Sequence, residues 1–399
     1  MTTGFDVLVV GAGPAGCVTA EEAARRGARV CLIEQSEEIG YPIRTSGGSF
    51  ISELRELGIS ERFFHAIRRV KFASRNRSIA FDYPEPVVCV LDVRALYQHL
   101  ALMAASAGVE LRLGSRVIDV VREGTRVCGV IVRTGGATHN YAAPVVVDCS
   151  GFAAVVLRKA GLRDSFRRFG FGAEYDLYAP RYPEDEALLV VGSDVIPCGY
   201  GWAFPRGGGR VRVGVGTIHP DTRAVPQRYL DRFMHECAAI APSLIGAQPL
   251  ERHVGYIPSE GVCREFVFDG VMAVGDAAGQ ASTLLGEGIR YSIKAGRMAG
   301  RVVGEAVVSG DPSRARLSQY QARWLAEHGR FMRLAYIINR RIARYDDAKW
   351  DRGIALLEKL SPQVFSRLLM SDFSPGVLAR VVAAAPRVLA SVFRSFVAN

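Results

Sequence analysis

The N-terminal stretch from Phe5 to Glu34 constrains the fold more than any other part of this sequence. An apolar run at 7–10 leads into a GAGPAG turn at 11–16, an Ala- and Glu-rich segment follows, and a second apolar run ends at Glu34. This order predicts a strand, a glycine turn, a helix and a parallel strand. Together these elements form the βαβ unit that binds dinucleotides.

Each glycine of this turn has a separate physical task. Gly11 allows the tight turn, Gly13 lets backbone N–H groups approach a pyrophosphate, and Gly16 lets the helix pack closely on the strand. The positive end of the helix dipole then faces the phosphates. Glu34 ends the second strand, where a carboxylate can accept hydrogen bonds from a ribose diol. The strand, the helix and the acid together argue against a purely structural glycine turn.

Composition narrows the remaining classes of protein. A chain of 399 residues is long enough for two interleaved domains. Its mean hydropathy is +0.12, yet no run reaches the roughly 18 apolar residues of a membrane-spanning helix. The N-terminus leads directly into a structural strand and shows no secretory signal. We therefore expect a cytoplasmic protein, with peripheral membrane contact left open.

Charge and cysteine content bear on nucleic-acid and metal binding. The net charge is +10, but the basic residues are scattered along the chain without a nucleic-acid-binding motif, so we expect no nucleic-acid partner. A solvated basic surface or attraction to anionic lipids explains the charge. The eight cysteines form no CxxC pair and mostly lie in apolar runs. We expect buried thiols in a reducing compartment and no metal site.

A second organised stretch, at 270–299, decides which dinucleotide binds. Here an apolar run ends in Gly275-Asp276, and a helix is predicted from about Gly288. A nicotinamide dinucleotide completes its site within one Rossmann unit, whereas FAD needs further donors for its ribityl chain and second phosphate. Asp276 can bond the ribityl hydroxyls, and the helix N-terminus at Gly288-Ile289 can face the flavin pyrimidine. The alternative for Asp276 is a helix N-cap.

The middle of the chain changes to an antiparallel-strand pattern. The triplet at 207–209 is all glycine and separates two alternating runs, which predicts a hairpin. The first run places Tyr200, Trp202 and Phe204 at a spacing of two residues, and therefore on one face of a strand. That face is either the wall of a substrate chamber or an ordinary sheet core. The polar groups of Tyr and Trp favour the chamber.

Taken together, these motifs resemble a known family. The glycine turn with Glu34, Arg94 in LDVRAL, DCSG at 148–151 and AVGDAAG at 273–279 resemble flavoproteins of the glutathione-reductase type, in the group that contains aromatic hydroxylases. Within that group, GYGWAFPRGGGRVRVGVG at 199–216 is similar to the YxWxFP…VGxG signature of the geranylgeranyl reductase family. Members of that family reduce isolated C=C bonds of isoprenoid chains.

The resemblance implies an architecture and a set of flavin contacts. We expect an α/β fold with a discontinuous Rossmann-type FAD-binding domain at 1–165 and 260–310, an inserted antiparallel-sheet substrate domain at 166–259, and a helical C-terminal region at 311–399. The family's flavin contacts match the following positions: Ala15, Glu34, Thr45, Ser46, Gly48, Arg94, Val117, Asp276, Gly288 and Ile289.

One departure from the family affects the expected chemistry. Archaeal members carry a Cys beside the flavin after a conserved Pro-x-Arg, and this chain has Thr45-Ser46 there. A mechanism that relies on that thiol is therefore excluded. We expect the hydroxyls of Thr45, Ser46 or Tyr200 to relay the proton, although hydroxyls are poor acids at neutral pH.

The C-terminal region combines Arg with apolar residues. Arg380, Arg387 and Arg394 repeat every seven residues, and the 331–342 stretch is amphipathic with Arg-rich edges. Such faces suit an anionic membrane surface. A dimer contact and packing over the substrate chamber are equally open interpretations, and the sequence leaves the oligomeric state undetermined.

The sequence as a whole indicates an FAD-dependent oxidoreductase that reduces C=C bonds of a geranylgeranyl-type chain on a lipid, a quinone or a related apolar substrate. No second GxGxxG motif is present, so the reductant is either transiently bound NAD(P)H or a protein electron donor. The alternative is an FAD-dependent monooxygenase, because hydroxylases and epoxidases share the scaffold. A halogenase and a non-catalytic flavin sensor fit the motifs less well.

Overall fold

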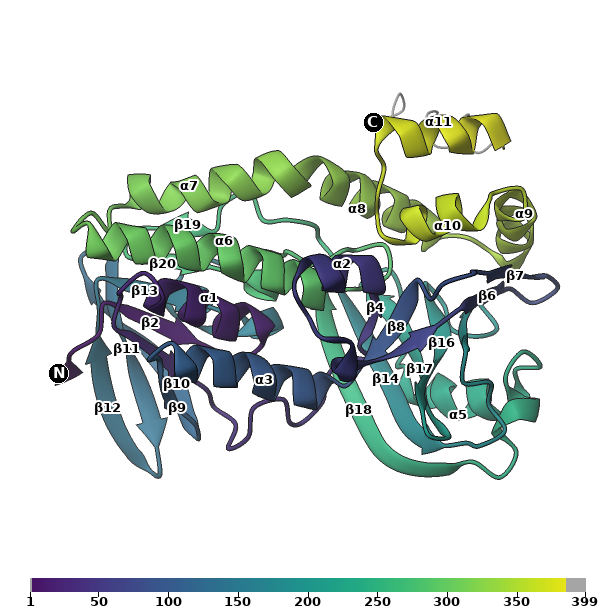
Figure 1. The fold of residues 1–399 in the computed structure, drawn as a ribbon, viewed down its shortest axis with the longest axis horizontal. Helices are drawn as coiled ribbons and strands as arrows, with labels where there is room; N and C mark the ends of the chain where they lie inside the picture. The colour runs from purple at the N-terminus through teal and green to yellow at the C-terminus, as the bar shows by residue number, and fades with distance from the viewer. Residues whose placement is uncertain (1, 385–399) are drawn as a thin grey trace.

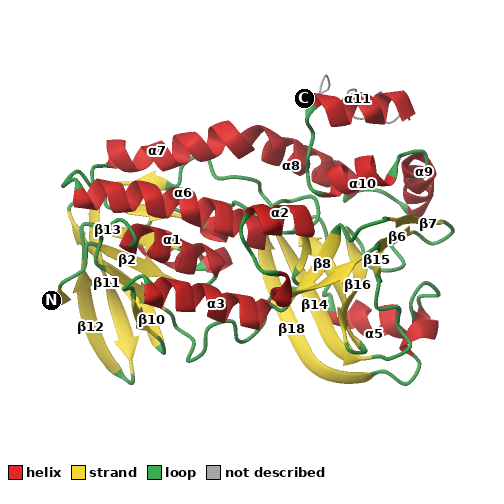
Figure 2. Cartoon of the chain, in the orientation of Figure 1, coloured by secondary structure: helices red, strands yellow, loops and turns green. Residues whose placement is uncertain are grey.

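The computed structural model describes residues 2–384 and shows two regions that lie side by side (Figures 1 and 2). The first region is built on a six-stranded sheet in the order β19-β20-β13-β2-β3-β9, parallel except at β19. Its strands are β2 (Val7–Val10), β3 (Val30–Ile33), β9 (Glu110–Arg112), β13 (Val145–Asp148), β19 (Val267–Phe268) and β20 (Val271–Ala273). Because both faces are covered, β2 and β13 are buried at every position, as parallel central strands usually are.

Helices cover one face of this sheet and a smaller sheet covers the other. The helices are α1 (Pro14–Ala24), α3 (Val93–Ser106) and α6 (Ile289–Val308), with α1 in contact with both of the others. The smaller sheet has the strands β1 (Thr2–Thr3), β10 (Ser115–Glu123), β11 (Arg126–Thr134) and β12 (Ala137–Ala142), and the short α4 (Val155–Lys159) packs on β10. Gly16, Gly296 and Gly300 bring α1 against its neighbours, since a Cβ at any of them would lie within 3.0 Å of backbone atoms.

The second region is a strongly curved seven-stranded sheet in the order β18-β14-β17-β16-β15-β6-β7 (Figure 2). The strands are β6 (Arg69–Ala73), β7 (Ser78–Asp82), β14 (Phe169–Tyr178), β15 (Glu186–Val191), β16 (Gly199–Gly207), β17 (Arg210–His219) and β18 (Gln248–Pro258). The glycine hairpin predicted at 207–209 is confirmed, because Gly207 pairs with Arg210 and both intervening glycines have positive φ. Helix α5 (Gln227–Glu236) covers one face of the sheet through Leu230 and Phe233.

Two strands of this sheet come from a part of the chain where the sequence analysis placed the nucleotide-binding domain. Strands β6 and β7, at 69–82, extend the sheet, and β6 pairs with β15 in parallel. Nearby lie α2 (Ile51–Glu56) and a three-stranded sheet of β4 (Gly48–Phe50), β5 (Phe64–Ile67) and β8 (Val88–Leu91). The large sheet is therefore mixed and extends beyond 166–259.

The helical C-terminal region is confirmed as far as the structure describes it. Its helices are α7 (Arg314–Trp324), α8 (Arg330–Ile342), α9 (Asp347–Leu357), α10 (Pro362–Leu369) and α11 (Pro375–Ala384), and a single π-helical turn, η5 (Leu325–Gly329), joins α7 to α8. Helices α7 and α8 run along the first region toward the second, where α9 and α10 lie over β6 and β7 (Figure 1). Arg387 and Arg394 lie outside the described residues. Within 2–384, no helix is both long enough and apolar enough to cross a membrane.

Candidate active site

A chamber of about 1770 Å³ lies between the two regions and takes its lining from both. Its floor is the carboxyl end of β2, β3 and β13 together with the N-termini of α1 and α6. Ligands of open α/β sheets bind at this edge. The opposite wall is the face of the large sheet that points away from α5, so the chamber joins a nucleotide-type cradle to a sheet surface.

The glycine turn forms the cradle as the sequence predicts. Gly11 has φ +100°, and a Cβ there would lie 2.5 Å from the carbonyl oxygen of Cys149. Gly13 faces open space, since a Cβ at that position would meet no atom within 4 Å. It is also the N-cap of α1, and no side chain caps that helix. The first N–H groups of α1 are therefore free to bind an anion such as a pyrophosphate.

Glu34 stands at the edge of the cradle in a fixed orientation. Its two carboxylate oxygens accept hydrogen bonds from the backbone N–H groups of Ala12 and Ser36, each at 2.8 Å. A carboxylate has about four acceptor positions, so these bonds leave capacity for the two hydroxyls of a ribose. This geometry fits the role predicted for Glu34.

Asp276 lies at the second nucleotide-type segment, in the 3₁₀ turn η4 (Gly275–Ala278). Gly275 packs on α1, since a Cβ there would lie 2.9 Å from that of Ala15, and a Cβ at Gly288 would lie 3.1 Å from Asp276 Oδ1. Burial raises the pKa of the Asp276 carboxyl to about 6. Helix α6 has Gly288 as its N-cap without a side-chain bond, so the alternative that Asp276 caps this helix does not hold. Among residues 2–384 the carboxylate has no hydrogen-bond donor, and it lines the chamber.

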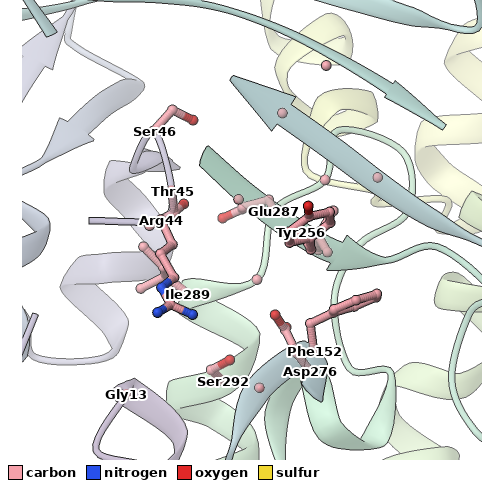
Figure 3. Close-up of a pocket in the computed structure, with 18 of the residues that line it drawn as sticks. Gly13, Arg44, Thr45, Ser46, Phe152, Tyr256, Asp276, Glu287, Ile289 and Ser292 are labelled. Carbon is pink, nitrogen blue, oxygen red and sulfur yellow. The ribbon is translucent and has the colours of Figure 1, made fainter. Parts of the chain in front are cut away.

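Arg44 is a chamber residue that the sequence analysis missed. Its side chain extends toward the same side as Gly13 and Ser292, across from Asp276 (Figure 3). Within the described part of the chain its guanidinium has no acceptor and no acidic partner. An unpaired cation beside a free helix N-terminus suits a phosphate. In the sequence, Arg44 is the arginine of the Pro-x-Arg motif. That motif could have identified it, but the sequence analysis used the motif only to locate the next residue, Thr45.

The other predicted flavin contacts lie in the chamber with one exception. Thr45, Ser46, Gly48, Val117 and Ile289 all contribute to its lining. Arg94 does not, because its Nε donates to Glu38 and its guanidinium lies 5.8 Å from the centre of the Tyr41 ring. One turn along α3, Tyr97 occupies the lining instead. Only its position three residues after Arg94, on the same face of the predicted helix, marks Tyr97 in the sequence.

The aromatic residues of β16 form part of the sheet wall. Tyr200, Trp202 and Phe204 line the chamber, whereas Gly201 faces α5, where a Cβ would lie 2.7 Å from Phe233. The Tyr200 hydroxyl donates to the carbonyl oxygen of Leu285, and burial raises the pKa of Tyr200 well above its ordinary value. The structure therefore places these three side chains at the chamber and not in the sheet core.

The Trp202 indole lies over glycines of the neighbouring strands. A Cβ at Gly214 would lie 2.3 Å from the indole, and Cβ atoms at Gly172 and Gly216 would lie 3.3 and 3.2 Å from it. At the far side, the indole Nε1–H donates to Glu174 Oε2 at 3.0 Å. The glycines after the aromatic run thus make room for the indole.

Comparison with known proteins agrees with this geometry. The chain matches the family model of FAD-dependent oxidoreductases over residues 6–166 and that of the geranylgeranyl reductase catalytic domain over residues 171–249. It is 31% identical to digeranylgeranylglycerophospholipid reductase 2 of Methanopyrus kandleri, over 96% of this chain and 98% of the relative. It is 32% identical to the protein of the same name from Methanothermobacter thermautotrophicus, over 82% and 84%.

Solved structures show the same architecture. A geranylgeranyl bacteriochlorophyll reductase-like protein from Thermoplasma acidophilum superposes with a TM-score of 0.87 at 26% identity, over 98% of this chain and 99% of that one. A flavin-dependent brominase superposes with a TM-score of 0.66 at 19% identity, over 92% and 98%, which shows a shared fold alone.

The cradle, the fold and these matches define an FAD-dependent oxidoreductase. The free N–H groups of α1, the unpaired Arg44 and the unpaired Asp276 fit FAD, because they offer donors to the phosphates and an acceptor to the ribityl hydroxyls. The chain belongs to the geranylgeranyl reductase family.

Proposed function

We propose that this chain saturates C=C bonds in the prenyl chains of a lipid of the digeranylgeranylglycerophospholipid class. Bound FAD, once reduced, supplies a hydride to one alkene carbon. The observation that carries the proposal is the continuity of the chamber, which extends from the cradle into an apolar lobe. The lobe is lined by the following residues: Ile67, Val70, Phe72, Leu189, Val191, Trp350, Leu357, Phe365, Leu368 and Leu369.

The protein's contribution to this reaction is position and the exclusion of water. An isolated alkene carries no charge for the site to hold, so its place depends on shape and apolar contact. Tyr200, Trp202 and Phe204 form a continuous aromatic surface, with ring centres of neighbours 5.6 and 6.4 Å apart. We infer that the prenyl chain lies along this surface, with Thr45 and Ser46 opposite.

The reductant and the access route belong to the same proposal. The chamber wall reaches Ile342 at the end of α8, Ala343 directly after it, and Trp350 on α9. Helix α8 carries Arg333 and Arg340 on its amphipathic face. An apolar substrate can then enter from a bilayer on which these helices rest. NAD(P)H or a protein electron donor reduces the flavin.

The test is turnover without oxygen. Protein loaded with FAD, reduced chemically under anaerobic conditions and mixed with a geranylgeranyl phospholipid, is expected to yield a product with two additional hydrogens per bond. The same mixture with a free geranylgeranyl alcohol tests whether the head group is needed. A product that forms only with oxygen and contains an oxygen atom from it would instead establish the alternative, a monooxygenase.

A further inference from the structure

Strand register places an acidic residue and a histidine in the chamber wall beside Trp202. Across β16, β17, β14 and β18, one row on the chamber face contains Trp202, Gly214, Glu174 and His253. The next row toward the chamber floor holds Tyr200 and three glycines, and the Trp202 indole and the Arg44 loop pack against these glycines. Glu174 and His253 both line the chamber, although each is at most 5% exposed.

The polar row continues as a hydrogen-bonded chain to solvent. His253 Nδ1 lies 2.8 Å from Glu174 Oε1, and His253 Nε2 lies 3.1 Å from Glu251 Oε2. The Glu251 side chain is 41% exposed. A proton can therefore pass from water to Glu251, through the imidazole, and on to the Glu174 carboxylate at the chamber.

The Thr45 loop crosses directly over this row. A Cβ at Gly255, one row from His253, would lie 2.1 Å from the carbonyl oxygen of Arg44. Two rows away, Arg212 Nη1 donates to the carbonyl oxygen of Ser46 at 2.6 Å. Thr45 spans the distance between these two contacts. The Thr45 loop thus packs on β17 and β18, next to Glu174 and His253.

We propose that Glu174 and His253 supply the proton of the alkene reduction. This inference rests on the proposed function. In the balanced step the π bond breaks, one carbon gains the hydride from reduced flavin, and the other carbon gains a proton that the His253 imidazolium passes on through the Glu174 carboxylate. Glu174 is left ionised, as it was at the start, and His253 recovers its proton from water through Glu251. No oxidant or further reductant is consumed in the transfer.

The charges around His253 favour its protonated form. Burial alone disfavours the imidazolium, but the hydrogen bond and charge of Glu174 and the hydrogen bond of Glu251 outweigh burial and the opposing charge of Arg212, so the pKa of His253 is raised. Arg212 is itself held by Asp176, and Arg210 lies between Asp176 and Glu251. The rate of alkene protonation is therefore expected to fall as pH rises through the raised pKa of His253.

The experiment is anaerobic single turnover of the FAD-loaded, chemically reduced protein with a geranylgeranyl phospholipid, measured across pH. Removal of a general acid lowers rates by about 100-fold or more. We expect Glu174→Gln and His253→Gln to show this loss, and His253→Gln also to lose the decline with rising pH. FAD binding should stay unchanged in both. His219→Gln is the matched control, because His219 on β17 bonds a backbone carbonyl and lies outside the chamber lining.

Three results would overturn the inference. One is a folded, FAD-loaded Glu174→Gln or His253→Gln protein with the wild-type rate. Another is a loss of rate with the wild-type pH profile retained, which would mean that the network only holds Trp202. A wild-type rate independent of pH would also overturn it, and this measurement needs no variant. Absence of saturated product from the wild type would instead refute the proposed function itself.

Discussion

Glycine makes room in two different ways on the two sides of the chamber. In the cradle, Gly13 leaves open space for a ligand, while Gly16 lets α1 approach the strand so closely that a Cβ would lie 1.8 Å from the Gly11 carbonyl oxygen. In the sheet wall, Gly214 and Gly255 make room for other parts of the protein, the Trp202 indole and the Arg44 loop. The cradle glycines contact parts of the same turn, whereas the wall glycines contact residues that are distant in the sequence.

The difference explains what each side recognises. Backbone N–H groups at a glycine turn bind phosphates, whatever the rest of the ligand is. The sheet wall, where glycines let the indole and the Arg44 loop pack closely, presents fixed aromatic and acidic side chains that select by shape and supply chemistry. The cradle therefore accounts for the FAD-dependent class, and the wall is where the reductase reaction is decided.

The largest expected effect comes from Gly16→Ala. Its Cβ would collide with backbone that cannot rotate away, so we expect destabilisation at or above the upper end of the usual cost of overpacking, about 3 kcal/mol, and loss of FAD.

Gly13→Ala should keep wild-type stability and lose only the flavin. Thermal unfolding and the flavin absorbance retained after gel filtration measure both properties. Gly353→Ala, with nothing near its Cβ, is the control. Equal stability of the Gly16 and control variants would contradict the account, in which Gly16 is needed for helix packing and Gly13 for the approach of the ligand.

Asp276→Ala should come next. Hydrogen bonds to charged groups contribute about 1.5–3 kcal/mol, so FAD affinity should fall about 10- to 100-fold. Ribityl donors favour the ionised carboxylate, and its pKa in the free protein is raised to about 6. The dissociation constant of the wild type should therefore rise as pH falls below about 6. Fluorescence titration of FAD against pH measures it, and Asp276→Asn should remove that dependence. An unchanged dissociation constant from neutral pH to pH 5 would contradict the assigned role.

Gly214→Ala tests the wall. The added Cβ would force the indole of Trp202 out of its place and break its bond to Glu174, at a cost of about 1–3 kcal/mol. FAD binding should be retained, and single-turnover reduction should slow. Near-ultraviolet circular dichroism reports the indole environment. A Gly214→Ala protein with wild-type spectrum and rate would show that the glycine is not needed for the indole.

The smallest effect concerns pH and stability. The pKa of His253 is raised in the folded protein, so its contribution is fully present below the unfolded value of about 6.5 and is lost as pH rises through the folded value. Chemical unfolding across this range should show a decline that His253→Gln lacks and His219→Gln retains. If stability declined by the same amount in His253→Gln, the pH dependence would have to come from another titratable group.

The two sides also differ in how far sequence can predict them. The glycine turn and Glu34 are predictable because one short, contiguous βαβ unit positions them. Asp276 is predictable because it forms a Gly-Asp pair at the end of an apolar strand. The predicted flavin contact at Arg94 is different, because its side chain lies outside the chamber lining and pairs with Glu38. A motif match cannot reveal such a competing partner. The Glu174–His253 pair is not predictable, because 79 positions separate the two residues and only the register of β14 with β18 brings them together. Recruitment of β6 and β7 is likewise a long-range pairing without a local signal.

The central claim is that this chamber saturates prenyl chains with a hydride from reduced FAD. Its most direct test is mass spectrometry of a geranylgeranyl phospholipid after anaerobic incubation with the reduced, FAD-loaded protein. We predict a product with two additional hydrogens per saturated bond, both of them deuterium when the reaction is run in deuterated water, because the transferable hydrogen of reduced flavin exchanges with solvent. An unchanged lipid without oxygen, together with an oxygenated product when oxygen is admitted, would contradict the claim.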